Sequence, residues 1–174
     1  MEIVYYVATS LDGFIAAPDG SVAWLQPFEG GGEDYGYAGF YASVDALILG
    51  SRTYEQALTF GEWPYAGKPC RVLTRRRRPS ARPDVVFTSA DPRSTAADLA
   101  SGGFRRAWLV GGGTLAGSFR RDGLITGYVV SVIPVVLGAG IPLFVAGGPS
   151  ENLRLVASRA YPGGVVQLTY ARAG

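Results

Sequence analysis

The chain has 174 residues, 48% of them apolar, and a formal net charge of +2. These values indicate one globular domain (residues 1–174) with enough apolar residues for a core, and the small charge gives no argument for nucleic acid. The chain has no histidine, which excludes Ser–His and Cys–His nucleophile pairs and the usual zinc and iron ligand sets, so no metal site is expected.

A single cysteine, Cys70, cannot form an intrachain disulfide and favours a reducing compartment. The N-terminus lacks a secretion signal, and no apolar run is long enough to span a membrane. We therefore expect a cytoplasmic protein without a membrane partner.

The first third of the chain predicts a central strand, a turn, a long loop and a helix. Residues 3–8 (IVYYVA) are β-branched and aromatic, as in a buried strand, and Asp12-Gly13 signals a turn. Apolar residues then recur at helical spacing over residues 33–43. Trp24 falls in the loop between them, where function and simple packing onto the core are equal alternatives.

Two further segments have the pattern of a strand, then glycine, then a helix. Residues 46–49 (ALIL) end at Gly50, and residues 107–117 (AWLVGGGTLAG) contain three glycines between strand and helix. Glycine allows a ligand to approach the backbone, and the first helical turn carries unpaired N–H donors and a partial positive charge. Both junctions therefore predict a phosphate site. The alternative for the second junction is a tight turn, which hardly needs three glycines.

A predicted strand at residues 71–74 leads into four consecutive arginines, residues 75–78. Such a run is usually a solvated loop or a nonspecific anion patch. It lacks the interleaved aromatic residues of a nucleic-acid surface. If the strand order places it beside the glycine junctions, one or two of these arginines would meet a phosphate monoester.

The remaining elements complete an α/β pattern. They are a strand at residues 84–88, a helix after Asp91-Pro92, a strand at residues 127–133, and a final pair of strands at residues 153–157 and 165–170. The order predicts a mixed, mostly parallel sheet of about eight strands with an antiparallel C-terminal pair.

The glycines Gly111 and Gly113, with Ala116, match the Rossmann fingerprint, but they come late in the chain and no acid follows about 20 residues on. A P-loop is excluded because no G-K-[ST] follows the glycines.

Five segments in order resemble the dihydrofolate reductase-like superfamily. More specifically, they resemble stand-alone members of the RibD C-terminal domain family, the reductase domain of bifunctional riboflavin-biosynthesis deaminase-reductases. The segments are TSLDGFIA (9–16), DALILGSRTYE (45–55), LTR (73–75), VGGG (110–113) and PVVLGAGIPLF (134–144). The resemblance covers nearly the whole chain and implies a three-layer α/β/α fold.

The resemblance implies NADPH as cofactor. One pyrophosphate junction would be formed by Gly50, Ser51, Arg52 and Thr53, and the other by Gly111, Gly112, Gly113, Thr114 and Leu115, with a strained peptide often joining the first two glycines. Arg52 would lie near the 2′-phosphate, Thr74 and Arg75 at the same phosphate or the adenine, and Asp12 and Ile15 over the nicotinamide. Arginine suits this role independently, because it binds phosphate in a bidentate way.

For the substrate, the resemblance implies Asp34 as the acid that orients or protonates it, with Glu33 as second candidate, and Ser131 at the pterin-like end of the pocket. Trp24 is the other expected contact. The alternative for Asp34 is a helix-start acid favoured by the helix dipole. The basic residue that riboflavin-pathway reductases have before the first loop is missing from residues 5–8 (YYVA).

We therefore expect an NADPH-dependent reductase acting on a small carbonyl or imine compound, such as a 5-amino-6-(5-phosphoribosylamino)uracil-like or pterin-like molecule. A homodimer is also expected, since members of the family often form one. One alternative is a nucleotide-binding or sensing protein without turnover. Another is an anion or nucleic-acid binder that uses residues 75–78.

Overall fold

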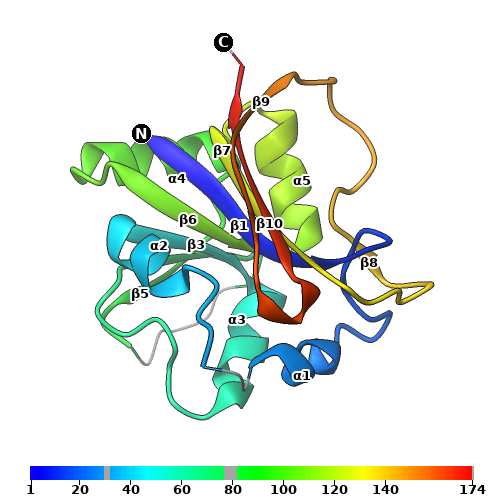
Figure 1. Cartoon of the computed structure of the whole chain (residues 1–174). Coiled ribbons are helices and arrows are strands. Elements are labelled where there is room, and N and C mark those ends of the chain that lie inside the picture. Colours follow the sequence, from blue (N-terminus) through cyan, green and yellow to red (C-terminus); the bar gives the residue numbers. More distant parts are fainter. Residues whose placement is uncertain (30–31, 77–81, 174) are drawn as a thin grey trace.

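A computed structural model describes residues 1–29, 32–76 and 82–173. Its centre is an eight-stranded sheet in the order β5-β4-β3-β6-β1-β7-β10-β9 (Figure 1). The strands are β1 (Glu2–Ser10), β3 (Ala46–Gly50), β4 (Cys70–Leu73), β5 (Val85–Thr88), β6 (Arg106–Gly111), β7 (Gly127–Ile133), β9 (Leu153–Ala160) and β10 (Val166–Arg172). The pairs among the first six strands are parallel, whereas β10 runs antiparallel to both β7 and β9. The predicted mixed sheet with an antiparallel C-terminal pair is confirmed.

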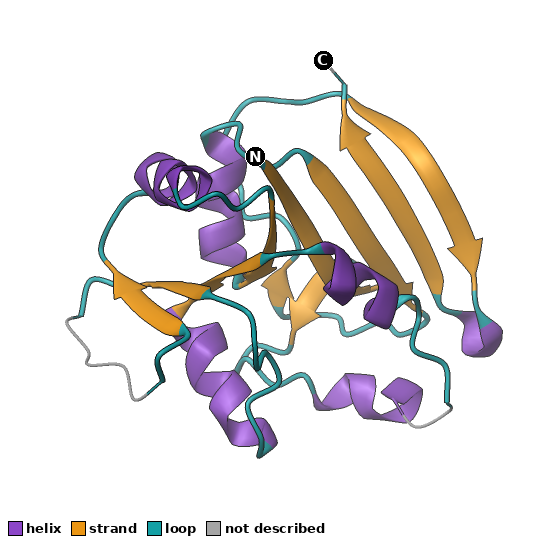
Figure 2. Ribbon diagram, turned by 90° about the vertical axis from the view of Figure 1, so that its left-hand side faces the viewer, coloured by secondary structure: helices purple, strands orange, loops and turns teal. Residues whose placement is uncertain are grey.

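Helices cover both faces of the sheet, so the predicted three-layer arrangement is also confirmed (Figure 2). α2 (Tyr37–Ser43) and α3 (Ser51–Ala57) lie on one face, and α4 (Pro92–Ser101) and α5 (Gly113–Arg121) on the other. Shorter elements are β2 (Phe14–Ala16), β8 (Ile141–Pro142), α1 (Gln26–Glu29) and the 3-10 turns η1 (Ala23–Leu25), η2 (Leu58–Phe60) and η3 (Pro162–Gly164).

The hydrophobic residues explain these layers. Side chains alternate along β1, so Tyr5 packs with the α4 and α5 side while Tyr6 packs with the α2 side. In the central strand β3, residues 46–49 are all fully buried, as expected for a strand covered on both faces. Trp108 of β6 is the centre of the aromatic cluster under α2, and its indole Nε1 donates to the Tyr6 carbonyl at 3.0 Å.

Two local details differ from the sequence-based expectations. Trp24, expected in a loop, lies in the helical turn η1 that leads into α1. The helix expected over residues 33–43 begins only at Tyr37, because Gly36 adopts a left-handed conformation (φ 76°) as its N-cap. Glu33 and Asp34 therefore precede the helix.

Candidate nucleotide and substrate site

The two glycine junctions meet at the carboxyl edge of the sheet. β3 and β6 are parallel neighbours, with Leu49 of β3 paired to Gly111 of β6. The chain leaves β3 through α3 toward β4, but leaves β6 through α5 in the opposite direction, toward β7. Open α/β sheets bind ligands in the crevice that such a reversal of strand order creates. The topology thus places both predicted phosphate junctions at the point where the strand order reverses.

The glycines allow the two junctions to approach closely. A Cβ on Gly50 would lie 3.6 Å from the Gly111 carbonyl oxygen, and one on Gly112 would lie 3.5 Å from Thr53 Oγ1. The peptide bond between Gly111 and Gly112 is cis. A Cβ on Gly113 would come within 3.1 Å of the Pro142 carbonyl oxygen, a tight contact that would require β8 to shift by a few tenths of an ångström.

Both junctions can accept an anion. The N-caps of α3 and α5 are Gly50 and Gly112, and neither helix has a side chain capping its first N–H groups. These donors, with the positive end of the α5 dipole, form the kind of site that holds a phosphate.

Two arginines follow the strand ends next to the glycine junctions. Leu73 of β4 pairs with Gly50 of β3, so the two strands end side by side. Arg52 follows the end of β3, and Arg75 follows the end of β4. Both residues are exposed, and neither makes an ion pair within the part of the chain that the structure describes. Thr74 stabilises the turn here, since its Oγ1 accepts from the Arg76 backbone N–H at 3.2 Å. Arg77 and Arg78, the rest of the arginine run, lie outside the described residues.

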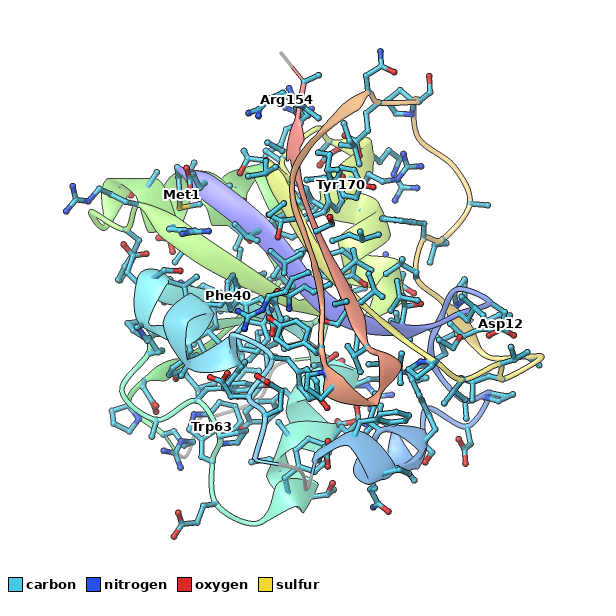
Figure 3. All side chains as sticks on the ribbon, in the orientation of Figure 1. Met1, Asp12, Phe40, Trp63, Arg154 and Tyr170 are labelled. Atoms are coloured by element: carbon cyan, nitrogen blue, oxygen red, sulfur yellow. The ribbon has the colours of Figure 1, made fainter. Side chains whose placement is uncertain are left out.

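Asp12 joins two loops. Its carboxylate accepts hydrogen bonds from Ser10 Oγ at 2.6 Å and from the backbone N–H groups of Leu137 and Gly138 at 3.1 and 2.7 Å. The Ser10 bond and then these backbone bonds lower the pKa of the carboxyl group. Figure 3 shows Asp12 where the β1–β2 turn meets the loop that follows β7. The described contacts thus make Asp12 a residue that positions these loops.

Ile15 lies against the second glycine junction. Its Cδ1 atom lies 3.7 Å from the position that a Cβ on Gly113 would take, and Ile141 of β8 lies against the same glycine. These residues form an apolar wall beside the second glycine junction.

The acids Asp34 and Glu33 are engaged with the backbone at the start of α2. Asp34 accepts from the N–H groups of Gly36 and Ala38 at 2.9 and 3.1 Å, one on each carboxylate oxygen. These two bonds lower the pKa of Asp34. Glu33 accepts from the Tyr35 N–H at 3.1 Å. The geometry is that of helix-start acids, which the sequence left open as the alternative.

Ser131 lies on β7, directly opposite Gln167 of β10. Ser131 is only 6% exposed, and its Oγ accepts a hydrogen bond from Gln167 Nε2 at 3.1 Å. The same Nε2 donates to the Tyr35 backbone carbonyl, also at 3.1 Å. Gln167 therefore links the sheet to the segment before α2.

Trp24 packs against a small cluster around Ile133, Tyr161 and Val165. Its indole Nε1 is buried and has no hydrogen-bond partner among the described residues. The structure thus shows Trp24 packed on this cluster, as the packing alternative predicts, and a role in substrate contact stays a prediction.

The sequence pattern missed several residues of this region. Gln167 belongs to no motif, and its position opposite Ser131 depends on strand register. Tyr6 lies on the same face, and burial raises the pKa of its phenol to about 12. Arg159 of β9 holds its guanidinium 4.5 Å from the ring centre of Tyr161. No periodicity or spacing could have assigned these residues to a site.

The strand order and the helices on both faces of the sheet define a dihydrofolate reductase-like α/β domain. A model of the RibD C-terminal domain matches residues 2–167, and the chain belongs to this family.

Relatives of similar length are known from Bacillus subtilis (strain 168). The uncharacterized protein YwjB is 41% identical over 173 residues, which cover 99% of this chain and 98% of YwjB. The uncharacterized protein YyaP is 27% identical over 182 residues, covering 97% of this chain and 94% of YyaP.

Among solved structures, a Shewanella sp. PV-4 protein provisionally assigned to riboflavin biosynthesis superposes with a TM-score of 0.91 at 30% identity, over 100% of both chains. The Thermotoga maritima deaminase/5-amino-6-(5-phosphoribosylamino)uracil reductase superposes with a TM-score of 0.75 at 12% identity, over 99% of this chain and 56% of that one. This second likeness shows the shared fold alone.

Within the described ranges, no group of three or more His, Cys, Asp or Glu residues is arranged to hold a metal ion. None of the described helices is both long and apolar enough to cross a membrane.

Proposed function

We propose that this protein is an NADPH-dependent reductase of the RibD C-terminal type. The observation that carries the proposal is that residues 50–53, which include Arg52, meet residues 111–115 where the strand order of the sheet reverses. Arg75 follows the end of the neighbouring strand β4. This combination of bare backbone donors and uncommitted guanidinium groups suits a dinucleotide with an additional phosphate monoester.

The residues present fit the cofactor. Gly111, Gly112 and Gly113, with the first N–H groups of α3 and α5, would hold the pyrophosphate, together with Thr53. Ser51, Arg52, Thr74 and Arg75 would hold the 2′-phosphate end. Ile15 and Leu115 would form apolar walls nearer the nicotinamide, with Asp12 fixing the loops and Thr114 in the first turn of α5. When bound, NADPH supplies a hydride.

The substrate proposed is a small carbonyl or imine compound of the uracil or pterin type, contacted by Ser131 and Trp24. Asp34 is the acid proposed to orient it, with Glu33 as the second candidate. Because the pKa of Asp34 is lowered, Asp34 is ionised at neutral pH and acts as a fixed negative charge rather than as a proton donor.

A second candidate function is nucleotide binding without turnover. The commitment of Asp34 favours it, because each of its carboxylate oxygens already accepts a backbone hydrogen bond at the start of α2. Oxidation of NADPH in the presence of any compound from a panel of carbonyls and imines would exclude this candidate.

We also propose a cytoplasmic homodimer, formed through the free edge of β9. All eight residues of β9 are exposed, and Leu155 and Val156 are 51% and 53% exposed. An edge strand with unpaired backbone groups and apolar side chains readily pairs with a second copy.

Thermal-shift titration with NADPH, NADH and 2′,5′-ADP tests the cofactor. A ligand at about 100 times its Kd adds about 2.7 kcal/mol, which corresponds to a rise in Tm of about 5–10 °C for a domain of this size. We expect a shift with NADPH and 2′,5′-ADP but a much smaller one with NADH.

Arg52→Ala should reduce the shift with NADPH and leave the NADH response unchanged. Arg154→Ala, which removes an exposed arginine from the opposite edge of the sheet, is the matched control. The absence of a shift with all three ligands in the wild-type protein would overturn the reductase proposal.

A further inference from the structure

The hydrogen bonds around Gln167 determine which way the Ser131 hydroxyl can act. The Gln167 side-chain amide meets the Ser131 hydroxyl and the Tyr35 backbone carbonyl, with its Nε2 at 3.1 Å from both oxygens. The Tyr6 phenol also interacts with this amide. Ser131 is 6% exposed, so bulk water does not readily replace these partners.

The orientation of the amide follows from its neighbours. A backbone carbonyl oxygen can only accept a hydrogen bond, and a side-chain amide has donors only on its nitrogen. If the amide were turned over, two acceptor oxygens would face each other at Tyr35. The Gln167 nitrogen must therefore face Tyr35, which places its second proton toward Ser131.

The direction of the next bond is then settled as well. Because the amide nitrogen is a donor only, the Ser131 oxygen accepts from Gln167 and cannot give its own proton back to it. Among the residues that the structure describes, no acceptor is found for that proton. Ser131 is thus a nearly buried hydroxyl whose proton has no acceptor among the described residues.

We propose that Gln167 is a positioning residue that makes Ser131 a hydrogen-bond donor, so that the substrate must present an acceptor, a carbonyl oxygen, at this point. This inference rests on the proposed function, because it concerns the substrate end of the same site. It adds a rule of specificity: a ring carrying an oxo group at this position is accepted, and a ring carrying an amino group there is disfavoured. A buried polar pair discriminates in this way because a mismatched partner leaves one group unsatisfied.

Two small heterocycles test this rule directly. Uracil presents carbonyl oxygens where 2,4-diaminopyrimidine presents amino groups on the same ring. Binding of each to the NADPH-loaded protein is measured by ligand-observed NMR, at a mildly alkaline pH where the diaminopyrimidine is uncharged. The variants are Ser131→Ala, Gln167→Met and Gln167→Glu. Thr169→Val is the matched control, since Thr169 lies on β10 two residues beyond Gln167 and on the same face.

We expect the wild-type protein to prefer uracil, and Ser131→Ala to weaken uracil binding about tenfold, the loss of one hydrogen bond. Gln167→Met should remove the preference, because the serine hydroxyl can then either donate or accept. Gln167→Glu should shift the preference toward 2,4-diaminopyrimidine, because a carboxylate takes the serine proton and leaves its lone pairs for an amino group. A purely structural role of Gln167 would weaken both probes alike and could not change their order.

An unchanged ratio of the two affinities in both Gln167 variants would overturn the proposal, as would a change of the same size in Thr169→Val. Failure of uracil to bind the wild-type complex would overturn it too. Failure of the proposed function is recognised separately, because NADPH would then produce no thermal shift in the wild-type protein.

Discussion

At the scale of single residues, the same side-chain type has different roles that only its partners reveal. Asp12 and Asp34 are both exposed acids with lowered pKa values, but Asp12 joins two loops, and Asp34 binds the N–H groups at the start of α2. Ser131, by contrast, has only one described partner, and its proton has no acceptor among the described residues. A residue with uncommitted hydrogen-bonding capacity is the better candidate for contact with a ligand.

The replacement Asp34→Asn separates the structural role of Asp34 from a role in the reaction. An amide nitrogen cannot accept from the Ala38 N–H, so we expect Tm to fall by about 2–4 °C, as for the weakening of one helix cap. If Asp34 also orients the substrate, kcat/KM of any active substrate falls at least tenfold more than in Asp91→Asn, a control that alters the cap of α4. Equal losses in the two variants would leave Asp34 with its structural role only.

A side chain at Gly113 is predicted to destabilise the fold. In Gly113→Ala the new Cβ would lie 3.1 Å from the Pro142 carbonyl oxygen and 3.4 Å from Ile141 Cγ2, so β8 must move. We expect a loss of about 1–3 kcal/mol in the free energy of unfolding by urea. Gly39→Ala in α2 is the control, because nothing lies within 4 Å of its Cβ position. It should be neutral or stabilising, and equal stability of both variants would contradict the close contact at Gly113.

At the scale of elements, the caps decide where the helices begin. α4 begins at Pro92 after the N-cap Asp91, whose Oδ1 accepts from the Ser94 N–H at 2.8 Å. α3 and α5 begin after glycines and carry no such side chain. α4 is therefore capped by its own chain, whereas α3 and α5, which begin at the two glycine junctions, keep their first donors for a ligand.

The contribution of the α4 cap should depend on pH. The Ser94 backbone bond, followed by the Ser94 hydroxyl bond, lowers the pKa of Asp91 below its ordinary value of 3.8. Because the pKa of Asp91 is lower in the folded state than in the unfolded state, the charged carboxylate stabilises the fold at any pH above the unfolded-state pKa. This stabilisation is lost as the pH falls from 3.8 toward the folded-state pKa.

The Tm difference between wild type and Asp91→Ala, about 2–4 °C at neutral pH, should therefore shrink in acid. Thermal melts along a pH series measure it. A difference that stays constant down to the acid limit of folding would show that the carboxylate charge is not involved.

At the scale of the whole molecule, the sheet has two free edges of different character. β5 at one edge has four residues, of which Val86 is 45% exposed, whereas β9 at the other has eight residues, all exposed. The longer edge lies away from the proposed cofactor crevice, so pairing through β9 would leave that crevice open (Figure 1).

If the dimer forms through β9, the double variant Leu155→Lys, Val156→Lys should convert it to a monomer. Lysines on an edge strand oppose pairing because they place like charges against each other across the two-fold axis. Light scattering coupled to size exclusion gives the mass. Val86→Lys on the β5 edge is the control and should remain dimeric, and a monomeric wild-type protein would refute this part of the proposal.

The sequence by itself determined the order and type of most elements, the mixed sheet and the two glycine junctions. These features depend on local chemistry: apolar runs form strands, and glycines followed by a helix leave N–H donors bare. The start of α2 could not be derived this way, because it depends on the left-handed conformation of Gly36 and on the bonds that Asp34 makes.

Only the tertiary structure decided which distant residues share the site. The meeting of Gly50 with Gly111 depends on the parallel register of β3 and β6, and the pairing of Ser131 with Gln167 on the antiparallel register of β7 and β10. Register is set by the packing of both sheet faces at once, and a shift by one residue would turn Gln167 to the other face. For this reason the residue we propose as the determinant of specificity carried no signal in the sequence.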